Sequence, residues 1–262
     1  MTRGLAPALV CLALLGVGAA RADAWAAAPC APAPAPVAHR GGTETKQENT
    51  VGAFRAAGEA GVRTWELDVR FDVTGTPVVL HDATVDRVSP RSGRITELDA
   101  TTTRLPTDDG QWIPSLREVY DEAVRAGATV LTEFKVMPSA EQWRAVIADV
   151  DATVGRSGVV LMSFDLGVVA EARAEMPGAA SGIVRSAGYL APEQIAEYGS
   201  SLMQAYRTVS PSRVASWHAG GITVYGWTPD AESDWQAMAD AGVDAVITDR
   251  PAAYRRWVAE RC

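Results

Sequence analysis

The stretch Ile222–Asp249, ITVYGWTPDAESDWQAMADAGVDAVITD, decides the fold. Two short runs rich in β-branched residues, Ile222–Thr228 and Asp244–Asp249, flank a segment that looks helical. Gly242 lies just before the second run, where the end of a helix favours glycine. A strand, a helix and a second strand in this order predict a β-α-β unit whose two strands are parallel.

The same alternation runs through the preceding part of the chain. Six further runs are candidate strands: Val37–Arg40, Thr64–Arg70, Thr129–Lys135, Gly158–Phe164, Ala179–Val184 and Ser201–Thr208. Ser115 with Glu118 and Ser139 with Gln142 have the spacing of a capping box, which predicts two helix starts. Eight strands that alternate with helices predict an α/β fold, a TIM (β/α)8 barrel, for which 262 residues suffice. A doubly wound open sheet is the alternative, but no candidate strand is followed by G-x-G-x-x-G.

Residues 83–113 break this rhythm. They are polar, rich in Thr, Asp and Arg, and have no helical period. A loop of this length is unusual inside a compact domain unless it has a function. We therefore expect a small insertion after the second strand, over the top of the barrel, as a candidate substrate lid.

The N-terminus has the features of an export signal. Arg3 precedes the apolar run Leu5–Ala20, and Ala22-Asp23-Ala24 fits a small-x-small cleavage site. The run is short for a membrane span, which needs about 20 residues. We expect residues 1–24 to be a cleaved signal peptide, with an uncleaved anchor as the alternative, and the mature protein to be secreted and extracellular.

Two cysteines, Cys30 and Cys262, lie close to the ends of the predicted mature chain. Residues 25–36, rich in Ala and Pro, predict a linker, which leaves 37–262 for the barrel. The first strand of such a barrel starts at the face where the last helix ends, so a disulfide between Cys30 and Cys262 is plausible in an oxidising compartment. Two unpaired thiols are the alternative, and Ala28-Pro29 is a poor context for a lipid anchor on Cys30.

The overall charge limits the class of ligand. The formal net charge is -8 and the pI is about 5.0. These values argue against a nucleic-acid partner, which would need a basic surface. A phosphate ester remains compatible with them, because one local cationic cluster or a bound metal is enough to hold a phosphate.

Three acidic residues lie on two adjacent candidate strands. Glu66 and Asp68 are two residues apart and so face the same side of their strand, and Glu133 lies on the next strand. Their apolar neighbours favour a buried location, where carboxylates need a partner. Ligands that are all oxygen suit Mg²⁺ or Ca²⁺ and form a poor site for zinc. We expect one divalent cation, Ca²⁺ or Mg²⁺; a solvated salt-bridge face is the alternative.

Two of the three histidines end strand-like runs. His39 ends the first strand, and His81 follows the extended piece Val78–Leu80. Catalytic groups of TIM barrels gather at the C-terminal ends of the strands. Hydrolysis of a phosphodiester needs a base and an acid, and histidine suits both near neutral pH. We expect His39 and His81 to be this pair, with a structural role as the alternative; for His218, in a helical segment, the structural or surface role is preferred.

Cationic side chains accompany these groups. Arg40 and Lys135 are expected to hold the non-bridging oxygens of a phosphodiester, whose transition state gains negative charge. A salt bridge to the acidic cluster is the alternative for Arg40. Thr50 is a candidate N-cap of the next helix, Glu48 is expected to orient a neighbouring side chain, and Asn49 to contact substrate.

These motifs, in this order, resemble the glycerophosphodiester phosphodiesterase family. The resemblance is carried by His39-Arg40-Gly41, Glu48-Asn49-Thr50, Glu66-Leu67-Asp68-Val69, His81-Asp82, Glu133-Phe134-Lys135, Trp227-Thr228, Gly242-Val243-Asp244 and Thr248-Asp249-Arg250-Pro251. It covers about residues 37–258. Each short motif is weak alone, but the first five, from His39-Arg40-Gly41 to Glu133-Phe134-Lys135, are specific in this order, and the later three agree with them. Gln47 stands where the family usually has proline, which loosens the loop but removes no chemical group.

The resemblance implies a TIM barrel with a small insertion and the same cation ligands, histidine pair and phosphate contacts. It adds Trp227 at the glycerol side of the pocket, with barrel-rim packing as the alternative. The implied reaction is hydrolysis of a glycerophosphodiester to glycerol 3-phosphate and an alcohol. With the predicted signal peptide, it indicates a secreted bacterial member of the family.

Two competing functions remain at this point. A related barrel phospholipase, of the C or D type, would act on intact phospholipids, but an apolar loop would suit it better than residues 83–113, where only Trp112 is aromatic. A non-enzymatic barrel would have lost a metal ligand or a histidine, and none is missing. We therefore expect a small-molecule substrate, no nucleic-acid partner and no stable insertion into a membrane.

Overall fold

The structure, a computed structural model, describes Met1 and residues 33–261. The predicted signal peptide, apart from Met1, and the predicted Cys30–Cys262 disulfide lie outside these residues. The end of the predicted linker is described, and it already belongs to the first strand. Strand β1 spans Ala35–Ala38, because Ala35 and Pro36 pair with the last strand of the barrel.

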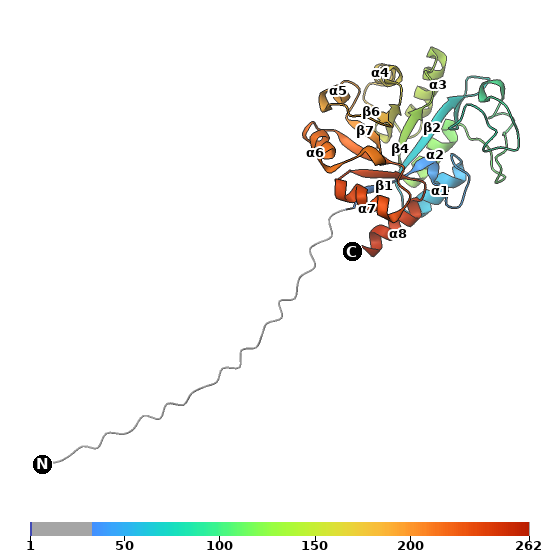
Figure 1. The fold of residues 1–262 in the computed structure, drawn as a ribbon. Helices are drawn as coiled ribbons and strands as arrows, with labels where there is room; N and C mark the ends of the chain where they lie inside the picture. The colour runs from blue at the N-terminus through green and yellow to red at the C-terminus, as the bar shows by residue number, and fades with distance from the viewer. Residues whose placement is uncertain (2–32, 262) are drawn as a thin grey trace. The chain divides into compact units, whose positions relative to one another are not determined.

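Eight parallel strands close into a barrel (Figure 1). They are β1, β2 (Thr64–Phe71), β4 (Thr129–Phe134), β5 (Val159–Ser163), β6 (Ala180–Arg185), β7 (Ser201–Ala205), β8 (Thr223–Trp227) and β9 (Ala245–Thr248). Strand β1 pairs with both β9 and β2, which closes the ring. A short strand, β3 (Pro77–Val79), runs antiparallel beside β2. The predicted TIM barrel is confirmed, and each of its strands overlaps a predicted one.

Helices surround the barrel. They are α1 (Val51–Glu59), α2 (Leu116–Ala126), α3 (Ala140–Asp151), α4 (Leu166–Glu175), α5 (Pro192–Ala196), α6 (Pro211–Ala219), α7 (Glu232–Ala241) and α8 (Pro251–Glu260). Ser115 and Ser139 start α2 and α3 with complete capping boxes, and Thr50 caps α1, as predicted. Gly127 and Gly242 end α2 and α7 in the left-handed conformation. Among the described residues, no helix is long and apolar enough to cross a membrane.

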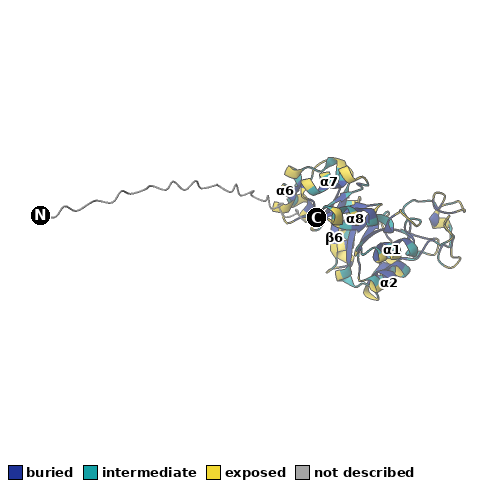
Figure 2. Cartoon of the chain, turned by 90° about the horizontal axis from the view of Figure 1, so that it is seen from below, coloured by how far each residue is buried: buried dark blue, intermediate teal, exposed yellow. Residues whose placement is uncertain are grey.

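Most residues of the barrel strands are buried (Figure 2). The interior of the barrel is packed with apolar residues: Val37, Leu131, Val160, Met162, Val184, Met203, Ala245 and Ile247. Strands of a parallel barrel are covered on both faces, which is why their sequences are nearly continuous apolar runs. Because this interior is a packed core and not a pore, a ligand site has to form at the mouth of the barrel.

Residues 83–113 form the predicted insertion, but they lie beside the barrel, next to α1 and α2 (Figure 1). The insertion has a small core of its own, which packs against Val78 and Leu80. Its buried apolar residues are Val85, Val88, Ile95, Ala100, Leu105 and Ile113. These residues are spaced irregularly and follow neither a helical nor a strand period, so the sequence did not predict this core. None of the insertion lines the cavity at the barrel mouth, so the expected lid over the barrel is not what the structure has.

Candidate active site

A cavity of about 230 Å³ lies at the C-terminal ends of the strands. One wall is charged and consists of His39, Arg40, Glu66, His81, Glu133 and Lys135. The remaining wall is largely apolar and includes Met162, Phe164, Val184, Met203, Trp227 and Ile247. Two larger hollows, of about 380 and 510 Å³, are lined by no histidine and by none of the predicted metal ligands. The predicted reactive groups therefore meet in the smaller cavity.

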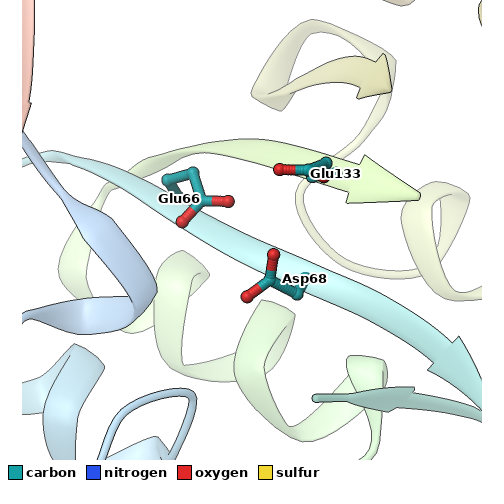
Figure 3. A group of neighbouring side chains, drawn as sticks. All are labelled: Glu66, Asp68 and Glu133. Carbon is teal, nitrogen blue, oxygen red and sulfur yellow. The ribbon is translucent and has the colours of Figure 1, made fainter. Parts of the chain in front are cut away.

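Three buried carboxylates lie together at the base of the charged wall (Figure 3). Glu66 and Asp68 come from the same side of β2, and Glu133 lies opposite Asp68 on β4. One oxygen of each residue lies within 4.8 Å of those of the other two. The structure thus brings together the three residues that the sequence predicted as metal ligands.

Two cations partly balance this acidic cluster. Lys135 Nζ lies 2.9 Å from Asp68 Oδ1 and also contacts Glu133, while Arg40 Nε lies 3.2 Å from Asp68 Oδ2. Burial opposes ionisation of Asp68, but Lys135 and Arg40 outweigh it and lower its pKa to about 2. Burial also raises the pKa of Glu133, although Lys135 opposes the rise. Among the described residues, the three acids of this cluster thus form ion pairs with two cationic side chains of Lys or Arg, Lys135 and Arg40.

Glu66 is the acid with the weakest compensation. Its only ion-pair contact among the described residues is with His39 Nε2, at 3.9 Å. Burial, and then the charge of Asp68, raise the pKa of Glu66 to about 8. A divalent cation would supply the missing positive charge, and a set of hard oxygen donors fits Ca²⁺ or Mg²⁺. The residues present therefore fit the predicted cation.

Both histidines of the cavity are held in the same way. The Nδ1 atom of His39 lies 2.6 Å from Asp249 Oδ1, and that of His81 lies 2.6 Å from Asp82 Oδ1. Because a carboxylate only accepts, each Nδ1 donates the proton in these hydrogen bonds. Each ring is thereby fixed, and its Nε2 remains available for proton transfer in the cavity.

The surroundings shift the two imidazole pKa values in opposite directions. Burial lowers the pKa of His39, but the hydrogen bond to Asp249 and the charge of Glu66 outweigh it, so the net shift is upward. At His81 burial is the largest effect and the net shift of the pKa is downward, despite the charge of Asp68. Two similar side chains thus differ in proton affinity because of their neighbours.

Arg40 has two kinds of contact. It lines the cavity, as the phosphate-binding prediction requires, and it also forms the salt bridges of the alternative interpretation. Its Nη1 donates to Glu48 Oε1 at 3.1 Å, and its backbone N–H, in a left-handed turn (φ 53°), donates to Glu66 Oε2 at 3.0 Å. Asn49 is buried and donates to Asp68 Oδ2 at 2.8 Å, so it positions a predicted metal ligand and does not line the cavity.

Trp227 lies in the apolar wall, as predicted from the resemblance. Its indole N–H donates to the carbonyl oxygen of Met203 at 3.0 Å. Its ring meets the ring of Phe164 edge to face, with centroids 5.6 Å apart. His218 lies outside the cavity, 2.9 Å from Asp244, which agrees with its predicted surface role.

The sequence did not identify the carboxylates that hold the histidines. A signal was present for both: Asp82 directly follows His81, and Asp249 follows the last strand, where TIM barrels place functional groups. Apart from Trp227, the apolar wall was also missed. Apolar residues at the ends of strands cannot be distinguished by sequence from the core residues that precede them.

Known proteins resemble this chain over most of its length. Residues 39–253 match the Glycerophosphoryl diester phosphodiesterase family. A glycerophosphodiester phosphodiesterase of Caldanaerobacter subterraneus subsp. tengcongensis is 30% identical over 229 residues, which cover 82% of this chain and 93% of that protein. Glycerophosphodiester phosphodiesterase 1 of Bos taurus is 37% identical over 109 residues, 38% of this chain and 33% of that protein.

Solved structures share the fold. A structure described as a putative glycerophosphoryl diester phosphodiesterase, from Silicibacter pomeroyi, has a TM-score of 0.79 at 24% identity and covers 88% of this chain and 95% of its own. A phosphodiesterase of Oleispira antarctica, solved with the product sn-glycerol-3-phosphate, has a TM-score of 0.76 at 24% identity. The match covers 87% of this chain and 97% of that chain. At these identities the likeness shows the fold.

Proposed function

The chain belongs to the glycerophosphoryl diester phosphodiesterase family, a family of hydrolases, and from that premise we propose how it works. It hydrolyses glycerophosphodiesters to glycerol 3-phosphate and an alcohol, with one divalent cation and with His39 and His81 as the acid/base pair. The observation that carries this proposal is one cavity in which two carboxylate-held histidines lie beside a buried carboxylate triad.

Glu66, Asp68 and Glu133 would hold the cation, Ca²⁺ or Mg²⁺. When bound, such an ion supplies positive charge that stabilises the negative charge developing on the phosphoryl oxygens. The raised pKa of Glu66 supports its presence, because this buried acid lacks a strong cationic partner. Asn49 keeps Asp68 in place through its hydrogen bond.

Proton transfer belongs to His39 and His81. One imidazole takes the proton from the attacking group, and the other gives a proton to the departing alkoxide. Asp249 and Asp82 keep the Nδ1 atoms protonated, so both transfers use the Nε2 atoms. The upward shift of the pKa of His39 and the downward shift of that of His81 support a pair whose two rings differ in proton affinity.

Arg40 and Lys135 would bind the non-bridging phosphoryl oxygens, since both cations line the cavity next to the triad. Trp227 would pack against the carbon skeleton of the glycerol group on the apolar wall. The Oleispira antarctica relative holds sn-glycerol-3-phosphate, and we propose the same product for this chain.

We further propose that the protein is secreted by the predicted signal peptide and that Cys30 and Cys262 form a disulfide. The support is the sequence pattern of residues 1–24 and the position of the two cysteines. Mass spectrometry of the unreduced secreted protein should show an N-terminus near residue 25 and a peptide that links the two cysteines. Free thiols at both positions would refute the disulfide.

The decisive experiment is release of glycerol 3-phosphate from glycerophosphocholine by the purified protein. We expect release with Ca²⁺ or with Mg²⁺ and none in excess chelator. Full activity in chelator would reject the metal role of the triad. If neither metal supports release but intact phospholipid is cleaved, the barrel phospholipase is the correct function.

A further inference from the structure

Arg87 lies in the insertion and does not line the cavity, yet its guanidinium joins two loops that do reach it. Its Nε lies 2.6 Å from Asp82 Oδ2. Its Nη1 and Nη2 lie 2.9 and 2.8 Å from Glu48 Oε2 and Oε1. The fork of a guanidinium matches a carboxylate in such a paired contact, so the geometry of both partners is constrained.

Each of these carboxylates also holds a residue of the charged wall. Asp82 uses Oδ1 for the Nδ1 proton of His81, and its other oxygen binds Arg87. Glu48 accepts from Arg40 Nη1 at 3.1 Å as well as from Arg87. Arg87, which lies outside the cavity, therefore contacts both the carboxylate that orients His81 and the carboxylate that orients Arg40.

The backbone around Arg87 is anchored. Val85 and Val88 are buried in the core of the insertion, with exposed fractions of 0% and 3%. The backbone N–H of Val88 donates to the carbonyl oxygen of Val85 at 3.0 Å, which closes a turn around the intervening residues. Asp108 donates its backbone N–H to the carbonyl oxygen of Val88. The insertion thus presents Arg87 from a fixed base.

We propose that Arg87 is a positioning residue, with which the insertion braces His81 and Arg40 through Asp82 and Glu48. The insertion acts from the side of the mouth, and its contribution is orientation. This inference rests on the proposed function, because it concerns the two residues to which proton transfer and phosphate binding are assigned there.

A purely structural ion pair would behave differently. The side chain of Arg87 is 47% exposed, and exposed ion pairs contribute little to folding stability. Its removal should therefore leave the fold intact while Asp82 and Glu48, without a shared cation, repel each other. The imidazole of His81 and the guanidinium of Arg40, which these carboxylates hold, would lose their fixed orientation, and turnover would fall.

The test compares three variants of the full chain with bound metal and glycerophosphocholine as substrate. Arg87→Gln should lower kcat by about tenfold to a hundredfold, as for other residues that orient reactive groups, with a smaller change in KM. Arg87→Lys should recover part of the loss, because an ammonium keeps the charge but not the fork. Arg91→Gln removes the same charge four residues away, at an exposed position for which the structure describes no ion pair, and should leave kcat unchanged.

A double-mutant cycle shows whether Arg87 acts through Asp82. If it does, Asp82→Asn combined with Arg87→Gln should lose less than the product of the two single losses. If the loss of kcat in the double variant equals the product of the two single losses, Arg87 does not act through Asp82 and the proposal is overturned. A kcat of Arg87→Gln within twofold of the wild type would overturn it as well. Thermal unfolding of each variant shows whether it folds, and Arg87→Lys serves if Arg87→Gln does not.

NMR of the protein without substrate tests the role of Arg87 independently of the proposed reaction. The Nδ1 proton of His81, hydrogen-bonded to Asp82, should give a protected NMR signal in the wild type and in Arg91→Gln, and should lose that protection in Arg87→Gln. A wild type that cannot turn over glycerophosphocholine would refute the proposed function. A signal that is unchanged in Arg87→Gln would refute the brace, whatever the substrate proves to be.

Discussion

The charged wall and the apolar wall of the cavity differ in what holds their side chains in place. On the charged wall, His39, His81 and Arg40 are each held by a carboxylate, from Asp249, Asp82 and Glu48 respectively. On the apolar wall, Met162 and Met203 are fixed by packing in the barrel core. Proton transfer needs directed hydrogen bonds, whereas an apolar surface needs only shape. We therefore propose that the charged wall carries out the chemistry and that the apolar wall selects the substrate.

The largest expected effect tests the charged wall. His39→Gln should lower kcat by about 10²- to 10⁴-fold, because a general acid or base is lost while the substrate contacts remain. Steady-state kinetics with glycerophosphocholine measures it. His218→Gln is the matched control, since this histidine lies outside the cavity, and it should retain full activity. A loss below tenfold at His39 would remove it from the proposed pair.

The next effect concerns the cation. Glu133→Gln replaces an oxygen anion of the triad by a neutral amide and should weaken binding of Ca²⁺ or Mg²⁺ by at least about tenfold. Isothermal titration calorimetry of the metal measures this without any substrate. Glu122→Gln is the control, because Glu122 is also a buried acid but pairs with Arg55 and Arg125 away from the cavity. Equal metal affinity in the two variants would contradict the triad.

A substitution in the apolar wall should reduce activity less, and should change KM more than kcat. Trp227→Ala removes ring surface from the substrate side and should lower kcat/KM by about tenfold, mainly through KM, as expected for the loss of one aromatic contact. Trp227→Phe keeps a ring and should lose less. A fall in kcat as large as that of His39→Gln would contradict the proposal that the apolar wall serves substrate binding and the charged wall the chemistry.

The smallest expected effect concerns a half-buried acid outside both walls, Asp149. Burial raises the pKa of Asp149, on α3, to about 6, although Arg117 opposes the rise. The folded state therefore binds this proton more tightly than the unfolded state, whose carboxyl has a pKa of about 3.9. Stability falls as the pH rises from about 4 through 6, and the loss is complete above pH 7.

Asp149→Asn should remove this loss. The variant should be more stable than the wild type by about 1 kcal/mol at pH 8, a value reduced from the full shift because the side chain is partly exposed to solvent. Near pH 4 the two proteins should be equally stable. Thermal unfolding at both pH values measures the difference, and an equal advantage at pH 4 would show that proton binding is not its cause.

Local sequence patterns predicted much of the fold and of the charged wall. The alternation of apolar runs with helical segments predicted each barrel strand, and the serines before α2 and α3 predicted their starts. The spacing of Glu66 and Asp68 predicted that they share a side of one strand. Such features depend on backbone geometry over a few residues, which the sequence expresses directly.

Closure of the barrel decided the rest. Asp249 reaches His39, 210 residues away, because β9 pairs with β1, and no local pattern records that contact. Arg87 reaches Glu48 because the irregularly spaced apolar residues of the insertion form a core beside the mouth. The sequence by itself determined which groups are present and on which strand ends they lie. Only the tertiary structure decided that Asp249 orients His39 and that Arg87 binds Glu48, because these contacts join segments that lie far apart in the sequence.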